Sequence, residues 1–195
     1  MPGPWPTREA QRVATRERLV SCAADIVRVE GQQELTVERV ATAASVNRTT
    51  FYLHFTGRNE LSLAVGVSYL LVVGDLLANW DGVKRPTELG ARRWVDAALR
   101  SVAADVRIAE LLDNALLTTP ESAVVLRQAM DAALDRMPRT LARVGDGGRP
   151  RLHVLVWSLV RSGVLLESQR GLLQRSAIVD LLAHQWFRET VPHSA

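Results

Sequence analysis

The sequence is poor in the residues that most often build catalytic and metal sites. Cys22 is the only cysteine among 195 residues, which excludes an intrachain disulfide and any site made of several cysteines. The four histidines are scattered, and none pairs with another histidine or with Cys22 at metal-ligand spacing. No nucleophile elbow, phosphate-binding loop, dinucleotide fingerprint or zinc-protease motif is present. We therefore expect no enzyme activity, no metal and no cofactor.

Strong net charge and an uninterrupted membrane-length run are also missing. The net charge is +3, so any binding to nucleic acid must come from a local surface. The N-terminus lacks the apolar core of a signal peptide. The most apolar run, residues 61–80, has about the length of a membrane span but is interrupted by Ser62, Gly66, Ser68, Gly74 and Asp75. We interpret it as a buried helix and expect a soluble cytoplasmic protein that does not bind membranes.

A helix–turn–helix pattern lies between residues 36 and 58. The first helix is expected over about residues 36–44, with Thr36 as its N-cap, and Ser45 and Val46 break it. Asn47 can cap a second helix that points Phe51 and Phe55 inward. The alternative is a pair of packed helices with no role in DNA binding.

The outward face of the second helix carries side chains that can bind DNA, namely Arg48, Thr49, Thr50, Tyr52 and His54. Arginine can bind a guanine edge with two donors, and threonine can contact a thymine methyl group. Threonine, tyrosine and histidine can hold phosphates. In a helix–turn–helix this second helix enters the major groove.

The stretch resembles the DNA-binding segment of the tetracycline-repressor (TetR) family of bacterial transcription regulators. The resemblance rests on TVERVATAASV, NRTTFYLHF and GRNEL and covers about residues 14–65. One departure is Ser45, where the family usually has glycine, so the turn needs a left-handed residue at a cost of up to about 1 kcal/mol. We predict that Arg48 and Thr49 read bases, while the residues that hold phosphates or brace the site are Thr36, Thr50, Tyr52, His54 and Arg58.

The apolar pattern predicts an all-α fold of about nine helices. Residues 1–13 form an arm, residues 14–58 a three-helix DNA-binding head, and residues 59–195 a larger helical domain for ligand binding and dimerisation. A long helix over about residues 59–79 connects the two domains. Pro138 should kink or split a helix expected over about residues 120–144.

The last two helices, at about residues 152–169 and 174–189, are apolar over much of their surface. A second copy would bury them in an intermolecular four-helix bundle, whereas the alternative is that they complete a monomeric core.

The resemblance implies a small-molecule pocket between the middle helices, whose occupation shifts the fourth helix and releases DNA. Candidate pocket residues are Trp80, Trp94, Asn114, Met130, Trp157 and Arg161. Core packing competes with ligand binding for the aromatic residues and Met130. A buried Arg161 needs a partner, which is Asp75, Asp113, Glu167 or a ligand carboxylate, and an internal salt bridge is favoured.

The resulting prediction is a ligand-responsive regulator, with repression favoured, that binds a roughly palindromic double-stranded DNA operator as a homodimer and is released by a small-molecule effector. The alternative is a helical small-molecule binding protein without operator-specific DNA binding. A helical enzyme would need a reactive constellation that the sequence does not display.

Overall fold

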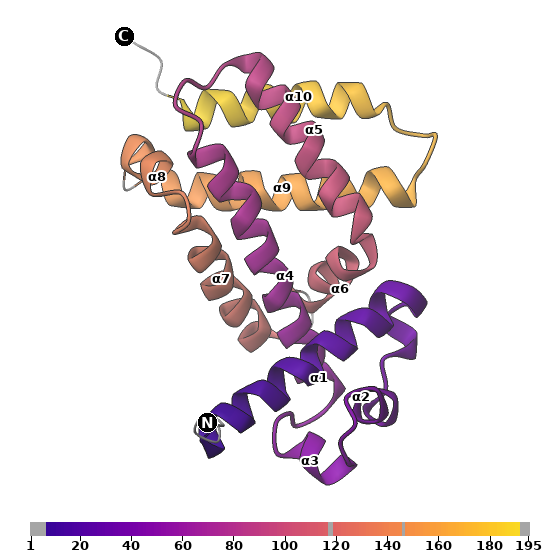
Figure 1. Cartoon of the computed structure of the whole chain (residues 1–195). Coiled ribbons are helices and arrows are strands. Elements are labelled where there is room, and N and C mark those ends of the chain that lie inside the picture. Colours follow the sequence, from indigo (N-terminus) through magenta and orange to yellow (C-terminus); the bar gives the residue numbers. More distant parts are fainter. Residues whose placement is uncertain (1–6, 117–118, 146, 192–195) are drawn as a thin grey trace, which may run out of the picture.

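The computed structural model describes residues 7–116, 119–145 and 147–191. Over these ranges the chain forms ten α-helices, one 3-10 turn and no strand, which confirms the all-α prediction. The helices divide into a small N-terminal group and a larger group stacked beyond it, joined by the long α4 (Figure 1). About nine helices were expected, and the tenth arises where one expected helix is split.

The N-terminal head consists of α1 (Arg8–Glu30), the 3-10 turn η1 (Gln32–Glu34), α2 (Val37–Ala43) and α3 (Arg48–Tyr52). Their apolar faces meet in a small core that continues onto the start of α4. The fully buried members of that core include Leu19, Ala23, Val27, Leu35, Val40, Phe51, Phe55, Leu61 and Val65. The core fixes the position of α3, which lies on the outer side of the head (Figure 1).

Helix α4 (Arg58–Asp81) runs from the head into the centre of the larger domain. This helix is long and apolar enough to cross a membrane, but half of its most apolar 18-residue stretch is buried inside the protein. It packs on α1 in the head and on α6 and α7 in the larger domain. These contacts support the interpretation of this run as a buried core helix.

The larger domain contains α5 (Glu88–Ala104), α6 (Val106–Leu116), α7 (Pro120–Leu134), α8 (Pro138–Val144), α9 (Gly148–Ser168) and α10 (Arg175–Thr190). Helices α9 and α10 lie roughly parallel in the upper part of Figure 1, and both pack against α5. Gly163 permits this close approach, since a Cβ atom there would lie 2.5 Å from Cγ1 of Val102.

The end of α4 is fastened to the C-terminal part of the chain by two buried contacts. The Asp81 carboxylate accepts hydrogen bonds from the backbone N–H of Arg139 (3.1 Å) and from the backbone N–H and hydroxyl of Thr140 (2.7 and 2.8 Å). Trp80 donates its indole N–H to the Thr190 hydroxyl at 3.1 Å. Since Asp81, Trp80, Thr140 and Thr190 are all buried, this end of α4 is held firmly.

Three helix boundaries differ from the sequence-based prediction. Helix α1 begins at Arg8 and not near Ala14, because Thr7 caps it by accepting from the N–H of Ala10 at 3.2 Å. The arm predicted over residues 1–13 is therefore wrong for residues 8–13, and residues 1–6 lie outside the described part of the chain. Pro138 splits the helix expected over residues 120–144, as predicted, and it occupies the first turn of α8.

Helix α3, the second helix of the helix–turn–helix and hence the candidate recognition helix, is also shorter than expected. It ends at Tyr52, so His54 and Phe55 lie in the connection to α4 and not on the helix. Helix α9, in contrast, begins at Gly148, earlier than the start expected at about residue 152. Pro150 is compatible with this start because the N–H groups of a first helical turn have no intrahelical partner.

Candidate nucleic-acid interface

The turn between α2 and α3 is closed by a residue in the left-handed conformation. Ser45 has φ = 55°, and it is the only non-glycine residue with positive φ in the described ranges. The N–H of Ser45 donates to the Thr42 carbonyl (3.0 Å), and that of Val46 donates to the Ala41 carbonyl (2.9 Å). These bonds end α2 and turn the chain into α3, so the strained turn expected at the position of the missing glycine is confirmed.

Helix α3 is short but well held. The Asn47 side chain accepts from the N–H of Thr50 at 2.7 Å and caps the helix. On the inner face Phe51 is fully buried, and the ring of Tyr52 meets it edge-on at a centroid distance of 5.5 Å. The outer face leaves Arg48, Thr49 and Tyr52 exposed, and Thr50 is half-buried. A rigid scaffold therefore presents a compact polar face.

Arg48 is engaged within the protein on this face. Its guanidinium forms an ion pair with Glu38 of α2, although both side chains are more than half exposed. A hydrogen bond with Tyr52 and the charge of Glu38 raise the pKa of Arg48 above its ordinary value. A DNA base that binds Arg48 must therefore displace Glu38, whose own charge repels phosphate.

Thr36 and Arg58, both predicted DNA contacts, also have partners inside the head. The Thr36 hydroxyl caps α2 by accepting from the N–H of Arg39 at 3.3 Å. Arg58, the first residue of α4, donates from Nη2 to the carbonyl of Gln32 at 2.8 Å. Thr36 and Arg58 are nevertheless exposed, so each side chain retains a polar surface that can contact phosphate.

His54 lies at the back of the recognition helix, half-buried against α1. Burial, followed by the charges of Arg12 and Arg16, lowers the pKa of His54 below its ordinary value and so favours the neutral imidazole. Its Nδ1 is buried and has no hydrogen-bond partner among the described residues. His54 is therefore better suited to offer phosphate a hydrogen bond from a neutral imidazole than a positive charge.

Arg16 of α1 is a residue that the sequence analysis missed. Its Nη1 donates to the main-chain carbonyl of His54 at 2.9 Å, and its guanidinium carbon lies 4.1 Å from the centre of the Phe55 ring. Arg16 thus ties α1 to the segment directly after α3. The sequence does contain a sign of this role, because Arg16 is a charged residue three positions before Leu19 and therefore lies on the apolar face of α1.

The predicted ligand-binding residues do not line one common pocket. Trp80 and Trp94 pack with Trp186 of α10 in a cluster in which the rings of Trp94 and Trp186 stack at 4.5 Å. Met130 is fully buried, and Trp157 is packed against the core. These four side chains fill the interior of the larger domain.

The two polar candidates lie elsewhere. Arg161 is exposed and not buried, and it pairs with Asp113, one of the three carboxylates considered for it. Asn114 lines a small polar cleft beside the head and donates to the Gln32 side chain at 3.3 Å. In the structure, Arg161 therefore has an internal carboxylate partner.

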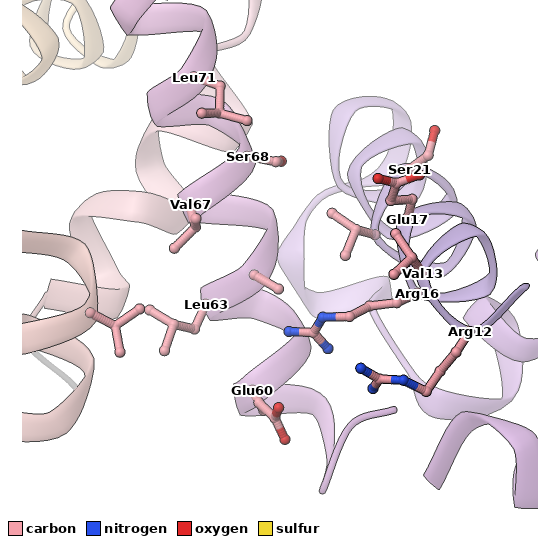
Figure 2. A pocket seen from close by; sticks show the side chains of 13 residues that line it. Arg12, Val13, Arg16, Glu17, Ser21, Glu60, Leu63, Val67, Ser68 and Leu71 are labelled. Carbon is pink, nitrogen blue, oxygen red and sulfur yellow. The ribbon is translucent and has the colours of Figure 1, made fainter. Parts of the chain in front are cut away.

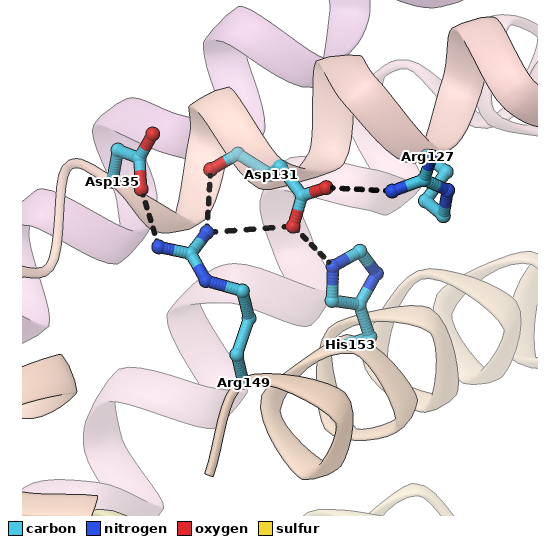
Figure 3. A network of polar contacts seen from close by, with 5 residues as sticks. All are labelled: Arg127, Asp131, Asp135, Arg149 and His153. Atoms are coloured by element: carbon cyan, nitrogen blue, oxygen red, sulfur yellow. Dashed lines mark hydrogen bonds and ion pairs between the residues drawn. The ribbon is translucent and has the colours of Figure 1, made fainter. Parts of the chain in front are cut away.

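A polar network joins α7 to α9 (Figure 3). Asp131 accepts from Nε2 of His153 at 2.9 Å, from Arg149 and from Arg127, and Arg149 also reaches Asp135 at 2.6 Å. The hydrogen bond from His153 is the main cause of the lowered pKa of Asp131. Over the described ranges, no group of three histidine, cysteine or acidic side chains has an arrangement that could hold a metal ion. The network therefore holds α7 against α9.

Known proteins resemble this chain in two ways. The sequence profile of bacterial regulatory proteins of the tetR family matches residues 19–65, which contain the helix–turn–helix. A search of the curated proteins found no match to this chain.

Solved structures resemble it over almost its full length. A TetR family transcription regulator from Marinobacter aquaeolei VT8 has a TM-score of 0.56 at 16% identity, and the match covers 94% of this chain and 98% of that one. The fatty acid degradation regulator FadR from Bacillus halodurans has a TM-score of 0.61 at 16% identity, with 87% and 93% covered. FadR from Thermus thermophilus, a TetR family repressor solved with lauroyl-CoA, has a TM-score of 0.61 at 19% identity, with 92% and 97% covered. The chain therefore has the fold of a TetR-family transcriptional regulator, and residues 19–65 belong to the DNA-binding domain of that family.

Proposed function

We propose that this protein is a ligand-responsive repressor that binds a roughly palindromic operator as a homodimer in the cytoplasm and has no enzyme activity. The observation that carries the proposal is the exposed polar face of α3, held in place by the Asn47 cap and the buried Phe51. A short helix presented in this way fits the major groove.

Within this face we assign base reading to Arg48 and Thr49. We assign phosphate contacts to Thr50, Tyr52 and Arg58. Thr36, at the start of α2, and His54, as a hydrogen-bond donor, complete this set. The Arg48 guanidinium is the one cationic group on α3, and its five donors suit the two acceptors of a guanine edge.

A second copy of the chain would cover the outer face of α9 and α10. Val154 and Leu165 of α9 and Leu181 of α10 are exposed there, beside a cleft of about 430 Å³ between the two helices. An exposed apolar surface on two adjacent long helices favours a four-helix interface between protomers. Dimerisation supplies the two recognition helices that a palindrome requires.

The effector is a small molecule whose binding changes the position of the heads. The Thermus thermophilus FadR structure is a complex with lauroyl-CoA, which supports a small-molecule effector for the present chain. In the present structure Trp80, Trp94, Met130 and Trp157 are packed together with the core, so a ligand in the larger domain would have to displace packed side chains there.

The test is a selection of DNA sequences by the purified full-length protein from randomised duplexes, followed by measurement of affinity against salt. We expect an inverted repeat whose binding weakens steeply as salt rises. If no sequence is enriched, the chain is a helical ligand-binding protein and not an operator reader.

Arg48→Ala identifies the base-reading side chain. Loss of Arg48 should cost about 1–3 kcal/mol and relax specificity at one position of each half-site. Arg170→Ala is the matched control, because Arg170 is also an exposed arginine paired with a glutamate but lies in the turn after α9. Unchanged relative affinities for operator variants after Arg48→Ala would remove Arg48 from base reading.

A further inference from the structure

A groove of about 730 Å³ lies between the head and the larger domain (Figure 2). Its walls come from three elements: Val13 and Val20 of α1, Leu63, Val67 and Leu71 of α4, and Val125 of α7. None of the six predicted ligand-binding residues contributes to it. The groove is therefore separate from the core of the larger domain.

The walls of the groove are apolar and partly uncovered. Leu71 is 59% exposed, and Val13 and Val125 are also exposed. On α4 the lining runs from Glu60 to Leu71, about 16 Å along the helix axis. An elongated apolar surface of this kind, contributed by three helices, is suited to an alkyl chain.

Arg16 lies at the end of the groove nearest the recognition helix. It is half-buried, and its hydrogen bond goes to a neutral acceptor, the His54 carbonyl. No carboxylate within the described ranges forms an ion pair with Arg16, whereas Arg12 beside it is paired with Glu9. A half-buried guanidinium without an acidic partner favours an anion from outside.

Two acidic residues also line the groove, and neither neutralises Arg16. Glu60 accepts from the N–H and hydroxyl of Thr56 at 2.7 and 2.9 Å. Glu17 is exposed and lies beside Ser21 in Figure 2, away from the Arg16 guanidinium. The lowered pKa of His54, caused by burial and then by Arg12 and Arg16, is consistent with a positive potential at this end.

We propose that this groove binds an anionic amphiphile, with its alkyl chain along Leu63, Val67 and Leu71 and a carboxylate head on Arg16. The planar guanidinium matches a carboxylate with two parallel hydrogen bonds, while the apolar walls exclude water from the chain. Binding at this site needs no displacement of the packed core.

The regulatory consequence rests on the proposed function. Arg16 holds the main-chain carbonyl that follows the recognition helix, so a carboxylate that draws Arg16 away releases this segment. A ligand that prefers the released form weakens operator binding by the same factor by which operator weakens ligand binding. The groove is thus a regulatory site at the junction of head and larger domain.

Binding is tested first without DNA. We would titrate full-length protein calorimetrically with sodium dodecanoate below its micelle concentration, and with dodecanol and dodecyltrimethylammonium as neutral and cationic probes. Dodecanoate should bind most tightly. Leu71→Glu should weaken it at least about tenfold, because a charge now lies in the path of the alkyl chain. Leu172→Glu, at a leucine that is 81% exposed and outside the groove, should have no effect.

Arg16→Gln separates the head group from the chain. Glutamine can still donate to the His54 carbonyl but carries no charge, so the preference for dodecanoate over dodecanol should disappear. Equal binding of dodecanoate by the wild type and Leu71→Glu would overturn the site. Equal or tighter binding of the cationic probe would overturn the assignment of an anion.

Operator binding is then measured with and without dodecanoate. We expect about a tenfold loss of affinity in the wild type and in Leu172→Glu, and none in Leu71→Glu. Dodecanoate bound in the groove without any effect on operator affinity would overturn the regulatory role. Failure to bind operator in the absence of ligand would overturn the proposed function and leave the calorimetric result standing.

Discussion

Glu38 competes with DNA for Arg48, the residue to which we assign base reading. The two side chains form an exposed ion pair across the helix–turn–helix, so Glu38 occupies the guanidinium to which we assign base reading. An exposed pair of this kind contributes little to stability, and its partner can be exchanged readily.

We expect Glu38→Gln to bind operator more tightly than the wild type, by roughly three- to tenfold at low salt. The substitution frees Arg48 and removes a negative charge that faces phosphate. The measurement is operator affinity by fluorescence anisotropy. Glu88→Gln, at an exposed glutamate of α5, is the control and should leave affinity unchanged. A weaker Glu38→Gln complex would show that the ion pair orients Arg48 for binding.

The left-handed backbone conformation of Ser45 should lower the stability of the protein, and this effect can be measured. Its φ of 55° is a conformation that a side chain disfavours and that glycine adopts freely. We expect Ser45→Gly to raise the free energy of unfolding by up to about 1 kcal/mol in urea denaturation. Ser176→Gly, in the first turn of α10, should not raise it, because glycine is a weaker helix former than serine. A fall in stability after Ser45→Gly would mean that the serine side chain stabilises the turn.

At the scale of elements, the N-terminus of α8 is capped by a residue from another helix. Met137, at the N-cap position, has no side-chain hydrogen bond, and the Asp81 carboxylate of α4 accepts from the second and third residues of α8 instead. The carboxylate also lies at the positive end of the helix dipole.

Asp81→Asn should lower the free energy of unfolding by about 1–3 kcal/mol, because the amide group brings donors toward a buried set of donors. Thermal and urea unfolding followed by circular dichroism would measure the loss. Asp75→Asn, on the same helix, is the control, since its exposed ion pair with Arg136 contributes less than about 1 kcal/mol. Equal effects of the two substitutions would argue against the cap.

The order of the helices could be predicted from sequence because each apolar face has a regular period. Pro138, for example, marked the division between α7 and α8. The start of α1 was missed because its first two turns extend beyond the head core and carry no apolar period.

The contacts between distant segments could not be read from sequence. Asp81 meets Thr140 over 59 positions. For Arg161 the sequence left three carboxylates open, and the structure pairs it with Asp113, 48 positions away. The groove between α1 and α4 depends on how three helices diverge, which no local pattern encodes. The residues of the helix–turn–helix were recognisable because they are close together in the chain, although the pairing of Arg48 with Glu38 was not.

At the scale of the whole molecule, the proposed dimer makes the outer face of α9 and α10 an internal surface. We expect Val154→Glu, at a residue that is 66% exposed in the single chain, to convert the dimer into a monomer because it places a charge in the interface. Light scattering after size-exclusion chromatography would measure this change, and operator affinity should fall with it. Val29→Glu, at a head valine that is 74% exposed, should leave the mass unchanged. A dimer that survives Val154→Glu would place the interface elsewhere.

The fastening of α4 at Trp80 and Asp81 turns small rotations into large displacements. The helix is 24 residues long, so its two ends are separated by about 36 Å. If the fastened end acts as the pivot, a rotation of about 5° carries Arg58 sideways by about 3 Å. That distance is close to the spacing of one base pair along DNA, about 3.4 Å. In the proposed dimer, which would read two half-sites, an angular change of this size is enough to put the recognition helices out of register with an operator.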